Sequence, residues 1–286
     1  MQSSDIGKLY LVATPIGNLS DVSDRVVNTL KNADFIAAED TRVSRKLLTH
    51  FGIKKPLLCY RKHNSRDAGM EVLNRILSGK SCALVTDAGT PGISDPGEEM
   101  VRLCVDAGVI VEVIPGPCAL ICALTLSGFP AGRFVFEGFL PSEKKKRLLV
   151  LRDLAHEKRT IVFYEAPHKL LRTLTDMHDI FGERRISISR EITKLYEETL
   201  RFTLSAAIVH FTEKTPRGEF VLVLEGSGNI DTNDKDNESE SFKNALTAVS
   251  ELVAKGMSER DAVKRAAFDT GCSRNDLYKA MIKAKS

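Results

Sequence analysis

The residues best suited to chemistry lie in short loops that directly follow apolar runs. The segment Asp87–Gly97 follows one such run and holds three glycines, two prolines and two aspartates in eleven residues. Proline stiffens a loop and glycine lets a ligand approach the backbone closely, so this composition predicts a preformed pocket for a small molecule. A plain surface turn is the alternative. Pro115–Ala119 repeats the pattern, with small residues at the start of a predicted helix whose free N–H groups would face the loop.

Three further loops carry charged side chains next to predicted strands. Phe163–His168 ends a strand and begins a helix, Arg190–Lys194 follows another strand, and Arg217–Glu219 precedes the last one. Ligands of open α/β sheets sit beyond the carboxyl ends of strands. These positions therefore favour a binding or catalytic role, although each loop alone is weak support.

Several common sites are absent from the sequence. Thr14–Leu19 stands where a dinucleotide-binding fold carries GxGxxG, but it has one glycine, which disfavours NAD and FAD. No GxxxxGKS/T segment occurs, which disfavours a P-loop nucleotidase. The six cysteines form no CxxC pair and the six histidines are scattered singly, so we expect buried thiols and no metal site.

The elements that must position these loops follow from hydrophobic patterning. Short apolar runs alternate with longer amphipathic stretches, which predicts an α/β protein with largely parallel sheets. Strands are expected at Leu9–Thr14, Phe35–Ala38, Ala83–Thr86, Val109–Ile114, Phe134–Phe139, Thr160–Tyr164, Ile186–Ser189 and Phe220–Leu224. Helices are expected at Asp21–Lys31, Ser44–Phe51, Asp67–Leu77, Glu98–Ala107, Cys118–Leu126, Lys144–Leu154, His168–Ile180 and Leu204–Phe211.

Length and punctuation indicate how the chain is divided. Its 286 residues are enough for two domains, and Pro115-Gly116-Pro117 is the strongest break in mid-chain. We therefore expect an N-terminal α/β domain at 1–115 and a C-terminal α/β domain at 116–226. The net charge of +3 conceals a flexible acidic linker at 227–241, of net charge −4, and a basic helical tail at 242–286, of net charge +4.

The tail contains three short helical patterns, two of them preceded by a capping box at Ser258/Asp261 and Ser273/Asp276. This arrangement resembles a helix-turn-helix unit, which leaves two interpretations open. The tail contacts nucleic acid, or it docks on its own body or on a second subunit. No apolar run approaches the roughly 18 residues of a membrane helix, and Met1–Gly7 lacks the pattern of a secretory signal, so a cytoplasmic location is expected.

The order and spacing of the motifs resemble the ribosomal RNA small subunit methyltransferase I family, within the tetrapyrrole-methylase superfamily. The resemblance covers about residues 8 to 226, and the tail segment Asn275–Lys279 is also similar to that family. The matching motifs are Leu11–Leu19, Ala37–Arg42, Asp87–Gly97, Pro115–Ala119, Glu137–Pro141, Phe163–His168, Arg190–Lys194 and Arg217–Glu219.

The resemblance implies a tetrapyrrole-methylase-like α/β fold, with two α/β domains, a cofactor cleft between them and a small helical C-terminal unit. It implies an S-adenosylmethionine-dependent homodimer that methylates the 2′-hydroxyl of a cytidine ribose in the decoding region of 16S ribosomal RNA. Carried over by position, the cofactor-binding residues are Pro15, Asp87, Gly89, Thr90, Ile93, Ser94, Pro117, Cys118, Ala119, Phe163, Tyr164 and Glu165.

Transfer of a methyl group to a ribose hydroxyl would gain from a base that accepts its proton. The candidates are Glu39, Asp40, Glu165, Glu191 and Lys194, all in loops of the matched motifs, and Lys194, Glu39 and Glu165 are preferred among them. A lysine would need a lowered pKa, which a neighbour such as Arg190 could provide. For each candidate the alternative is a salt bridge that holds a loop, and Lys194 could also contact a phosphate.

RNA binding requires basic surfaces that meet phosphates. The helical run Lys144, Lys145, Lys146 and Arg147 is one candidate, although solvated helix decoration explains it about as well. Arg42 and Arg190, in the matched motifs, are further candidates.

Two other functions remain open at this point. A methylase of a tetrapyrrole or of another small molecule would share the cofactor loops but would have no evident use for the basic tail. A non-catalytic ribosome-binding factor would have no reason to keep the stiff, glycine-rich loops.

Overall fold

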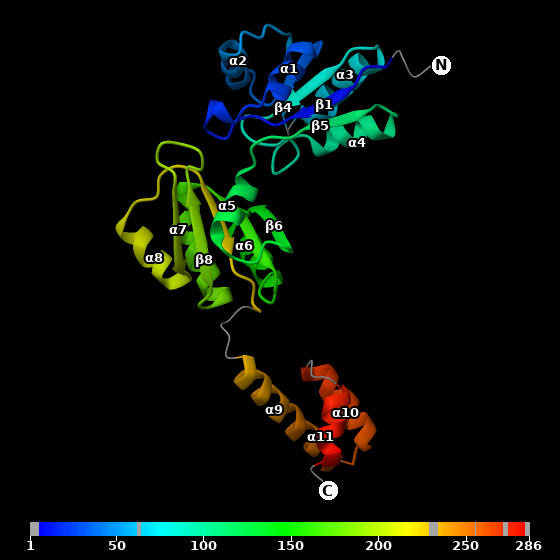
Figure 1. Ribbon diagram of the computed structural model, residues 1–286, viewed down its shortest axis with the longest axis vertical. Helices are drawn as coiled ribbons and strands as arrows, with labels where there is room; N and C mark the ends of the chain where they lie inside the picture. Colours follow the sequence, from blue (N-terminus) through cyan, green and yellow to red (C-terminus); the bar gives the residue numbers. More distant parts are fainter. Residues whose placement is uncertain (1–5, 62–63, 229–233, 255, 271–273, 284–286) are drawn as a thin grey trace. The chain divides into compact units, whose positions relative to one another are not determined.

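The computed structural model describes residues 6–61, 64–228, 234–254, 256–270 and 274–283. These residues fall into two compact units, one ending at Gly228 and the other beginning after it, and each is described by itself. The larger unit contains two five-stranded sheets and the smaller one consists of helices (Figure 1). Across the described residues, no helix has the length and apolar character needed to cross a membrane.

The first sheet is entirely parallel and its strand order is β3-β2-β4-β1-β5. Its strands are β1 (Leu9–Val12), β2 (Phe35–Ala38), β3 (Leu57–Cys59), β4 (Cys82–Val85) and β5 (Val111–Ile114). The intervening helices are η1 (Leu19–Asp21), α1 (Asp24–Asn32), α2 (Thr41–His50), α3 (Ser65–Leu77) and α4 (Glu98–Asp106). Parallel strands need crossover connections, and the helices supply them.

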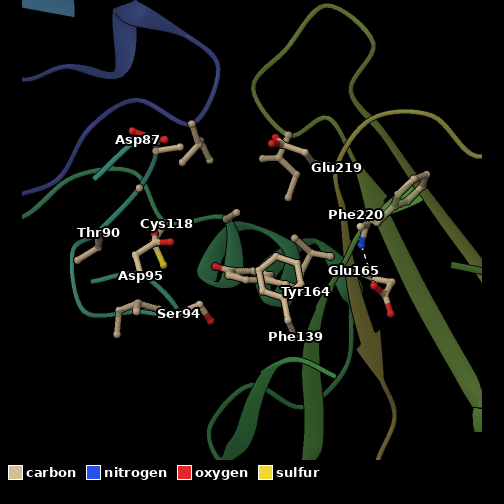
Figure 2. A pocket seen from close by; sticks show the side chains of 18 of the residues that line it. Asp87, Thr90, Ser94, Asp95, Cys118, Phe139, Tyr164, Glu165, Glu219 and Phe220 are labelled. Carbon is tan, nitrogen blue, oxygen red and sulfur yellow. Dashed lines mark hydrogen bonds between the residues drawn. The ribbon is translucent and has the colours of Figure 1, made fainter. Parts of the chain in front are cut away.

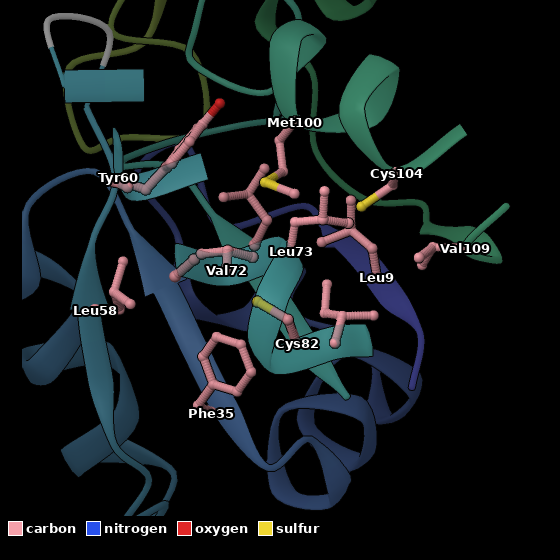
Figure 3. Packing of buried hydrophobic residues seen from close by; sticks show 14 of the residues in the cluster. Leu9, Phe35, Leu58, Tyr60, Val72, Leu73, Cys82, Met100, Cys104 and Val109 are labelled. Carbon is pink, nitrogen blue, oxygen red and sulfur yellow. The ribbon is translucent and has the colours of Figure 1, made fainter. Parts of the chain in front are cut away.

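Helices cover both faces of this sheet. Alternate residues of a strand point to opposite faces, and both sets are apolar here, so each face must be buried. Leu9 and Phe35 face α3 and α4, where they pack with Val72 and Met100 (Figure 3). Ile36 of the same strand β2 lies in the separate cluster that includes residues of α1 and α2. Burial on both faces explains why the central strands read as uninterrupted apolar runs.

The second sheet has the order β6-β7-β10-β8-β9, with β6 and β7 parallel and the other neighbours antiparallel. Its strands are β6 (Phe134–Phe139), β7 (Thr160–Glu165), β8 (Arg185–Arg190), β9 (Glu198–Thr203) and β10 (Phe220–Leu224). The expectation of largely parallel sheets is thus right for the first sheet and wrong for the second. A short loop joins β8 to β9, and so short a connection permits only an antiparallel pair.

Helices also cover both faces of the second sheet (Figure 1). These helices are α5 (Ala119–Ser127), α6 (Lys144–Asp153), α7 (Pro167–Phe181) and α8 (Leu204–Glu213). Leu120 and Leu124 of α5 pack against Val162 and Val221 on one face, while α6, α7 and α8 cover the other. The chain passes from the first sheet to α5 through residues 115–118, the segment at which the sequence predicted a domain boundary.

The smaller unit is formed by α9 (Asp234–Ala254), α10 (Glu259–Thr270) and α11 (Arg274–Lys283), which share an apolar core containing Val249, Val263 and Leu277. Ser258 accepts a hydrogen bond from the Asp261 backbone N–H at 3.3 Å, as an N-cap does, while the Asp261 carboxylate accepts from the Ser258 hydroxyl at 2.6 Å and not from its backbone N–H as in a capping box. The second box, at Ser273, lies outside the described residues.

The linker predicted at 227–241 needs a correction, because α9 begins inside it at Asp234. Composition alone favoured a flexible segment there, since acidic and polar residues bury little surface. Acidic residues are also favourable in the first turns of a helix, where they meet the positive end of the helix dipole.

Candidate functional site

A cavity of about 460 Å³ lies in the larger unit and takes its lining from both sheets (Figure 2). Parallel strands end at the same edge of a sheet, so the loops after β1, β2, β4 and β5 gather on one side of it. The lining consists of Ile16, Glu39, Asp87, Ala88, Gly89, Thr90, Ile93, Ser94, Asp95, Cys118, Ala119, Phe139, Tyr164, Glu165, Ala166, Pro167, Ile192, Glu219, Phe220 and Val221.

Hydrogen bonds join the loops of the first sheet to one another. Thr14 and Gly89 exchange two backbone hydrogen bonds, of 2.9 and 3.1 Å, and Gly89 adopts a positive φ of 81°. The Thr14 hydroxyl donates to the Thr86 carbonyl at 3.1 Å, and the Thr90 hydroxyl donates to the Pro117 carbonyl at 3.3 Å. These hydrogen bonds hold the loops to one another, as a preformed site requires.

Two backbone positions in these loops are under special constraint. A Cβ at Gly116 would lie 2.9 Å from the Cβ of Ala13, so only glycine fits this approach between the loops after β1 and β5. Ser94 adopts a φ of 65°, in the left-handed region that non-glycine residues rarely occupy. Such strain is typical of functional sites, and Ser94 lines the cavity.

Three carboxylates concentrate negative charge on one wall of the cavity. Burial, followed by the charges of Glu39 and Asp87, raises the pKa of Asp95 to about 6. Burial also raises the pKa of Glu39, although the backbone N–H of Asp87 donates to its carboxylate at 3.4 Å. A wall of this kind attracts a cationic ligand, because a positive charge relieves the repulsion between the carboxylates.

Aromatic side chains form part of the opposite wall (Figure 2). The rings of Phe139 and Tyr164 lie 5.5 Å apart between centroids, and Phe139 leaves 58% of its surface exposed. The Tyr164 hydroxyl accepts a hydrogen bond of 3.1 Å from the Leu120 backbone N–H, and burial raises the pKa of Tyr164. This wall offers an apolar, aromatic surface to a planar ligand group.

Nine of the twelve residues predicted to bind the cofactor line this cavity. Of the other three, Pro15 lines a neighbouring cavity, and Pro117 contributes the carbonyl that accepts from Thr90. Phe163 needs a correction, because it is fully buried in the core beneath α7 and α8. It lies next to Tyr164 on β7, and adjacent strand residues face opposite sides.

The structure also corrects the role predicted for Glu165. Its carboxylate accepts hydrogen bonds from the Ala166 backbone N–H at 2.8 Å and from the Thr173 hydroxyl at 2.6 Å. The residue is 3% exposed. Both oxygens are therefore engaged at the start of α7, which makes Glu165 a support for that helix rather than a base.

Lys194 was predicted to act as a base with a lowered pKa, and the structure reverses that direction. Burial alone would lower the pKa of Lys194, but hydrogen bonds to Glu219 at 2.5 Å and Glu191 at 3.0 Å outweigh it and raise the pKa. Arg190 instead pairs with Glu198 at 3.7 Å. Lys194 is held as a cation between two carboxylates and does not line the first cavity.

The predicted RNA-binding side chains differ in exposure. Lys144, Lys145 and Lys146 are exposed on α6, whereas Arg147 is 4% exposed and pairs with Asp176 at 2.7 Å. The prediction for Arg147 is therefore wrong, because one residue of a helical run turns toward the core. Arg42 lies at the start of α2 with its side chain 82% exposed, at 2.6 Å from the Asp40 carboxylate.

Several lining residues were missed by the sequence reasoning, among them Asp95, Phe139 and Glu219. Asp95 and Glu219 belong to the motifs Asp87–Gly97 and Arg217–Glu219. Their carboxylates, next to predicted strands, could have marked them as candidates for the site. Phe139 could not be found from alternation, because a bulge between Phe136 and Gly138 shifts the register of β6. With the bulge, Phe136 and Phe139 both contact Tyr164.

Across the described residues, no group of three or more His, Cys, Asp or Glu side chains is arranged to hold a metal ion. Cys82 and Cys104 are buried, and burial raises the pKa of Cys82 to about 12 and that of Cys104 to about 11. Both are unreactive thiols of the core.

The two sheets and the cavity that they line define a protein of the tetrapyrrole-methylase class. The sequence profile of the tetrapyrrole (corrin/porphyrin) methylases matches residues 8–208. The fold is also similar to that of uroporphyrin-III C-methyl transferase from Thermus thermophilus, solved in complex with S-adenyl homocysteine. That structure gives a TM-score of 0.54 at 17% identity, over 78% of this chain and 98% of the other.

Within this class, the chain belongs to the ribosomal RNA small subunit methyltransferase I family. It is 47% identical to the protein of that name from Synechocystis sp. over 98% of this chain and 99% of the relative. It is 45% identical to the one from Halalkalibacterium halodurans over 97% of this chain and 95% of the relative. The fold class and the family expected from the motifs are thereby confirmed.

Proposed function

We propose that this protein transfers a methyl group from S-adenosylmethionine to the 2′-hydroxyl of a cytidine ribose in the decoding region of 16S ribosomal RNA. The observation that carries the proposal is the match, over nearly their whole length, to proteins named ribosomal RNA small subunit methyltransferase I. The finer target, a cytidine 2′-hydroxyl, follows from the resemblance of the motifs to that family.

The cavity fits S-adenosylmethionine in charge and in shape. This cofactor supplies an electrophilic methyl group on a positively charged sulfur, and it also carries an ammonium group. Asp87, Asp95 and Glu39 would hold these positive charges. Burial and the two neighbouring carboxylates all raise the pKa of Asp95, and a bound cation would offset that effect. Tyr164 and Phe139 would pack against the adenine, and the volume of about 460 Å³ is in the range of cofactor sites.

The ribose oxygen must lose its proton as it forms a bond to carbon. Among the described residues of the cavity, Glu39 and Asp95 are the carboxylates whose pKa values are raised. The one that does not face a positive charge of the cofactor would keep its raised pKa and would be a stronger base than an ordinary acidic side chain. We propose that one of them accepts the proton, in place of Lys194. The remaining contribution of the chain is to align the reacting groups, which by itself accounts for a large part of the acceleration.

The proposed partners are ribosomal RNA and a second copy of this chain. Exposed cations at Arg42 and at Lys144, Lys145 and Lys146 would meet RNA phosphates, with Arg190 at the edge of the site. A homodimer in the cytoplasm, as implied by the resemblance, completes the proposal, and light scattering of the purified protein tests the dimer.

The proposed reaction is tested with small ribosomal subunits from a strain that lacks the modification. The protein and labelled S-adenosylmethionine are added, and the product is mapped by mass spectrometry and by resistance to alkaline cleavage, which a 2′-O-methyl group confers. A corrinoid precursor serves as a parallel substrate. A methyl group on a decoding-region cytidine ribose supports the proposal. A methyl group on a base, at another site or only on the corrinoid overturns it.

A further inference from the structure

A second cavity, of about 490 Å³, lies directly beside the first. The two share four lining residues, Ile16, Asp87, Ala88 and Glu219. A molecule that fills the second cavity therefore comes into contact with the same side chains that border the cofactor cavity.

One side of α2 supplies five of the fifteen residues that line the second cavity, as many as the segment that follows β1. Val43 and Leu47 supply apolar surface, and Lys46 and His50 supply polar groups. Ser44 also lines this cavity, and its hydroxyl is buried without a hydrogen bond partner among the described residues. A buried hydroxyl without a partner is unfavourable, and such groups are often found where a ligand or an ordered water binds.

The exposed surface of α2 beside the second cavity is cationic, whereas the lining itself contains two lysines, Lys46 and Lys194, and two carboxylates, Asp87 and Glu219. Helix α2 contains Arg42, Arg45 and Lys46 and no acidic residue in its ten positions, and all three side chains are exposed. On the other side, the loop after β8 places Lys194 in the lining. The next residues in that loop, Leu195 and Tyr196, are 88% and 70% exposed, as expected of side chains that contact a partner such as a nucleic-acid base.

We propose that the second cavity receives the base of the target nucleotide after it leaves the RNA stack. The ribose then lies at the four shared residues, and the flanking phosphates lie on Arg42, Arg45 and Lys46. This inference rests on the proposed function. The ribose of a stacked nucleotide is held at the edge of the helix by its base and its neighbours, so it enters a recessed cavity only when the nucleotide leaves the stack, as happens in enzymes that modify bases.

The test is to fill the cavity with a larger side chain. Val43 is 41% exposed, so Val43→Trp narrows the cavity without disturbing the core. We expect kcat/KM for small ribosomal subunits to fall by about 10²-fold, because a displaced ribose is poorly aligned. The Kd for S-adenosylmethionine should stay within about twofold by calorimetry, because the cofactor cavity does not include Val43. Val209→Trp on α8, at a valine 59% exposed and outside both cavities, is the matched control.

A second pair of substitutions does not depend on packing. Replacing Arg42 and Arg45 by alanine should raise KM for the subunits and reduce the slope of log K against log salt concentration by roughly 2. If Val43→Trp methylates subunits at the wild-type rate, or if the arginine variants keep the wild-type salt slope, the inference is overturned while the proposed function stands. A wild-type protein that binds S-adenosylmethionine but methylates no subunit overturns both.

Discussion

The proposed binding of S-adenosylmethionine against the carboxylate wall of the cavity predicts an affinity that depends on pH. Asp95 has its pKa raised to about 6, first by burial and then by Glu39 and Asp87. A bound cation needs the ionised form. With a pKa of about 6, the ionised fraction falls from about nine-tenths at about pH 7 to about one-tenth at about pH 5. The apparent Kd rises inversely with that fraction, hence by about 10-fold.

Isothermal calorimetry measures this dependence directly. Titrations of the wild type between about pH 5 and about pH 7 should show the rise in Kd, with about half a proton released per site near pH 6. Asp95→Asn should bind more weakly at about pH 7 and should lose most of the pH dependence. Glu137→Gln is the control, since burial raises the pKa of Glu137 too but this residue does not line the cavity. A flat Kd in the wild type, or an unchanged profile in Asp95→Asn, would refute the reasoning.

The raised pKa of Asp95 makes the ligand-free protein less stable as the pH rises, whereas cofactor binding is expected to become stronger as the pH rises. Folding raises the pKa of Asp95 from 3.8 to about 6, so the protonated form is favoured in the folded state. Stability from this group is fully present below about pH 4 and is lost as the pH rises through about 6. Asp95→Asn should therefore raise the Tm of the ligand-free protein at about pH 7 and leave it nearly unchanged at about pH 4.

Three further outcomes follow from the packing and charges. Gly116→Ala should lower the free energy of unfolding by about 1–3 kcal/mol in urea titrations, because the new Cβ would lie 2.9 Å from that of Ala13. Arg147→Ala should cost about 3–5 kcal/mol in the same assay, since it leaves the buried Asp176 carboxylate unpaired. Replacing residues 144–146 by alanine should change stability by less than about 0.5 kcal/mol and should flatten the salt dependence of RNA binding.

Each of these outcomes has a control within the chain. A Cβ at Gly132 would meet nothing within 4 Å, so Gly132→Ala should not reproduce the effect of the change at Gly116. Arg152→Ala removes an exposed arginine from the same helix as Arg147. Equal losses for the two arginine variants would contradict a stabilising role for the buried pair. An unchanged salt slope after neutralisation of the lysines would remove α6 from the RNA-binding surface.

The sequence predicted most elements because their patterns are local. The bounds expected for β6 and β10 agree with the structure to the residue. Strands β3 and β9 were missed, and both are edge strands. Strand β3 is apolar but only three residues long, and β9 is half-exposed and contains four polar residues. The glycine-rich loops could be predicted to line a pocket, because the residues that form a turn are neighbours in the sequence.

The errors at the site come from partners that are distant along the chain. The pKa of Lys194 is raised most by Glu219, which lies 25 residues further on, and then by the nearby Glu191. The buried Arg147 pairs with Asp176, 29 residues away. Neither contact is visible before the strands and helices are placed in space. Charge alone made Lys194 a candidate base and Arg147 a candidate phosphate contact, and tertiary pairing changed both assignments.

The shared lining of the cofactor cavity links the two sheets thermodynamically. Asp87 follows β4 of the first sheet and Tyr164 lies on β7 of the second, so unfolding of either sheet destroys the site. A ligand at 100 times its Kd adds about 2.7 kcal/mol against either event. Amide hydrogen exchange should then slow by the same factor in β2 and in β8, although neither core touches the ligand. The supply of cofactor would in this way set how long the folded body survives proteolysis, as well as how fast it works.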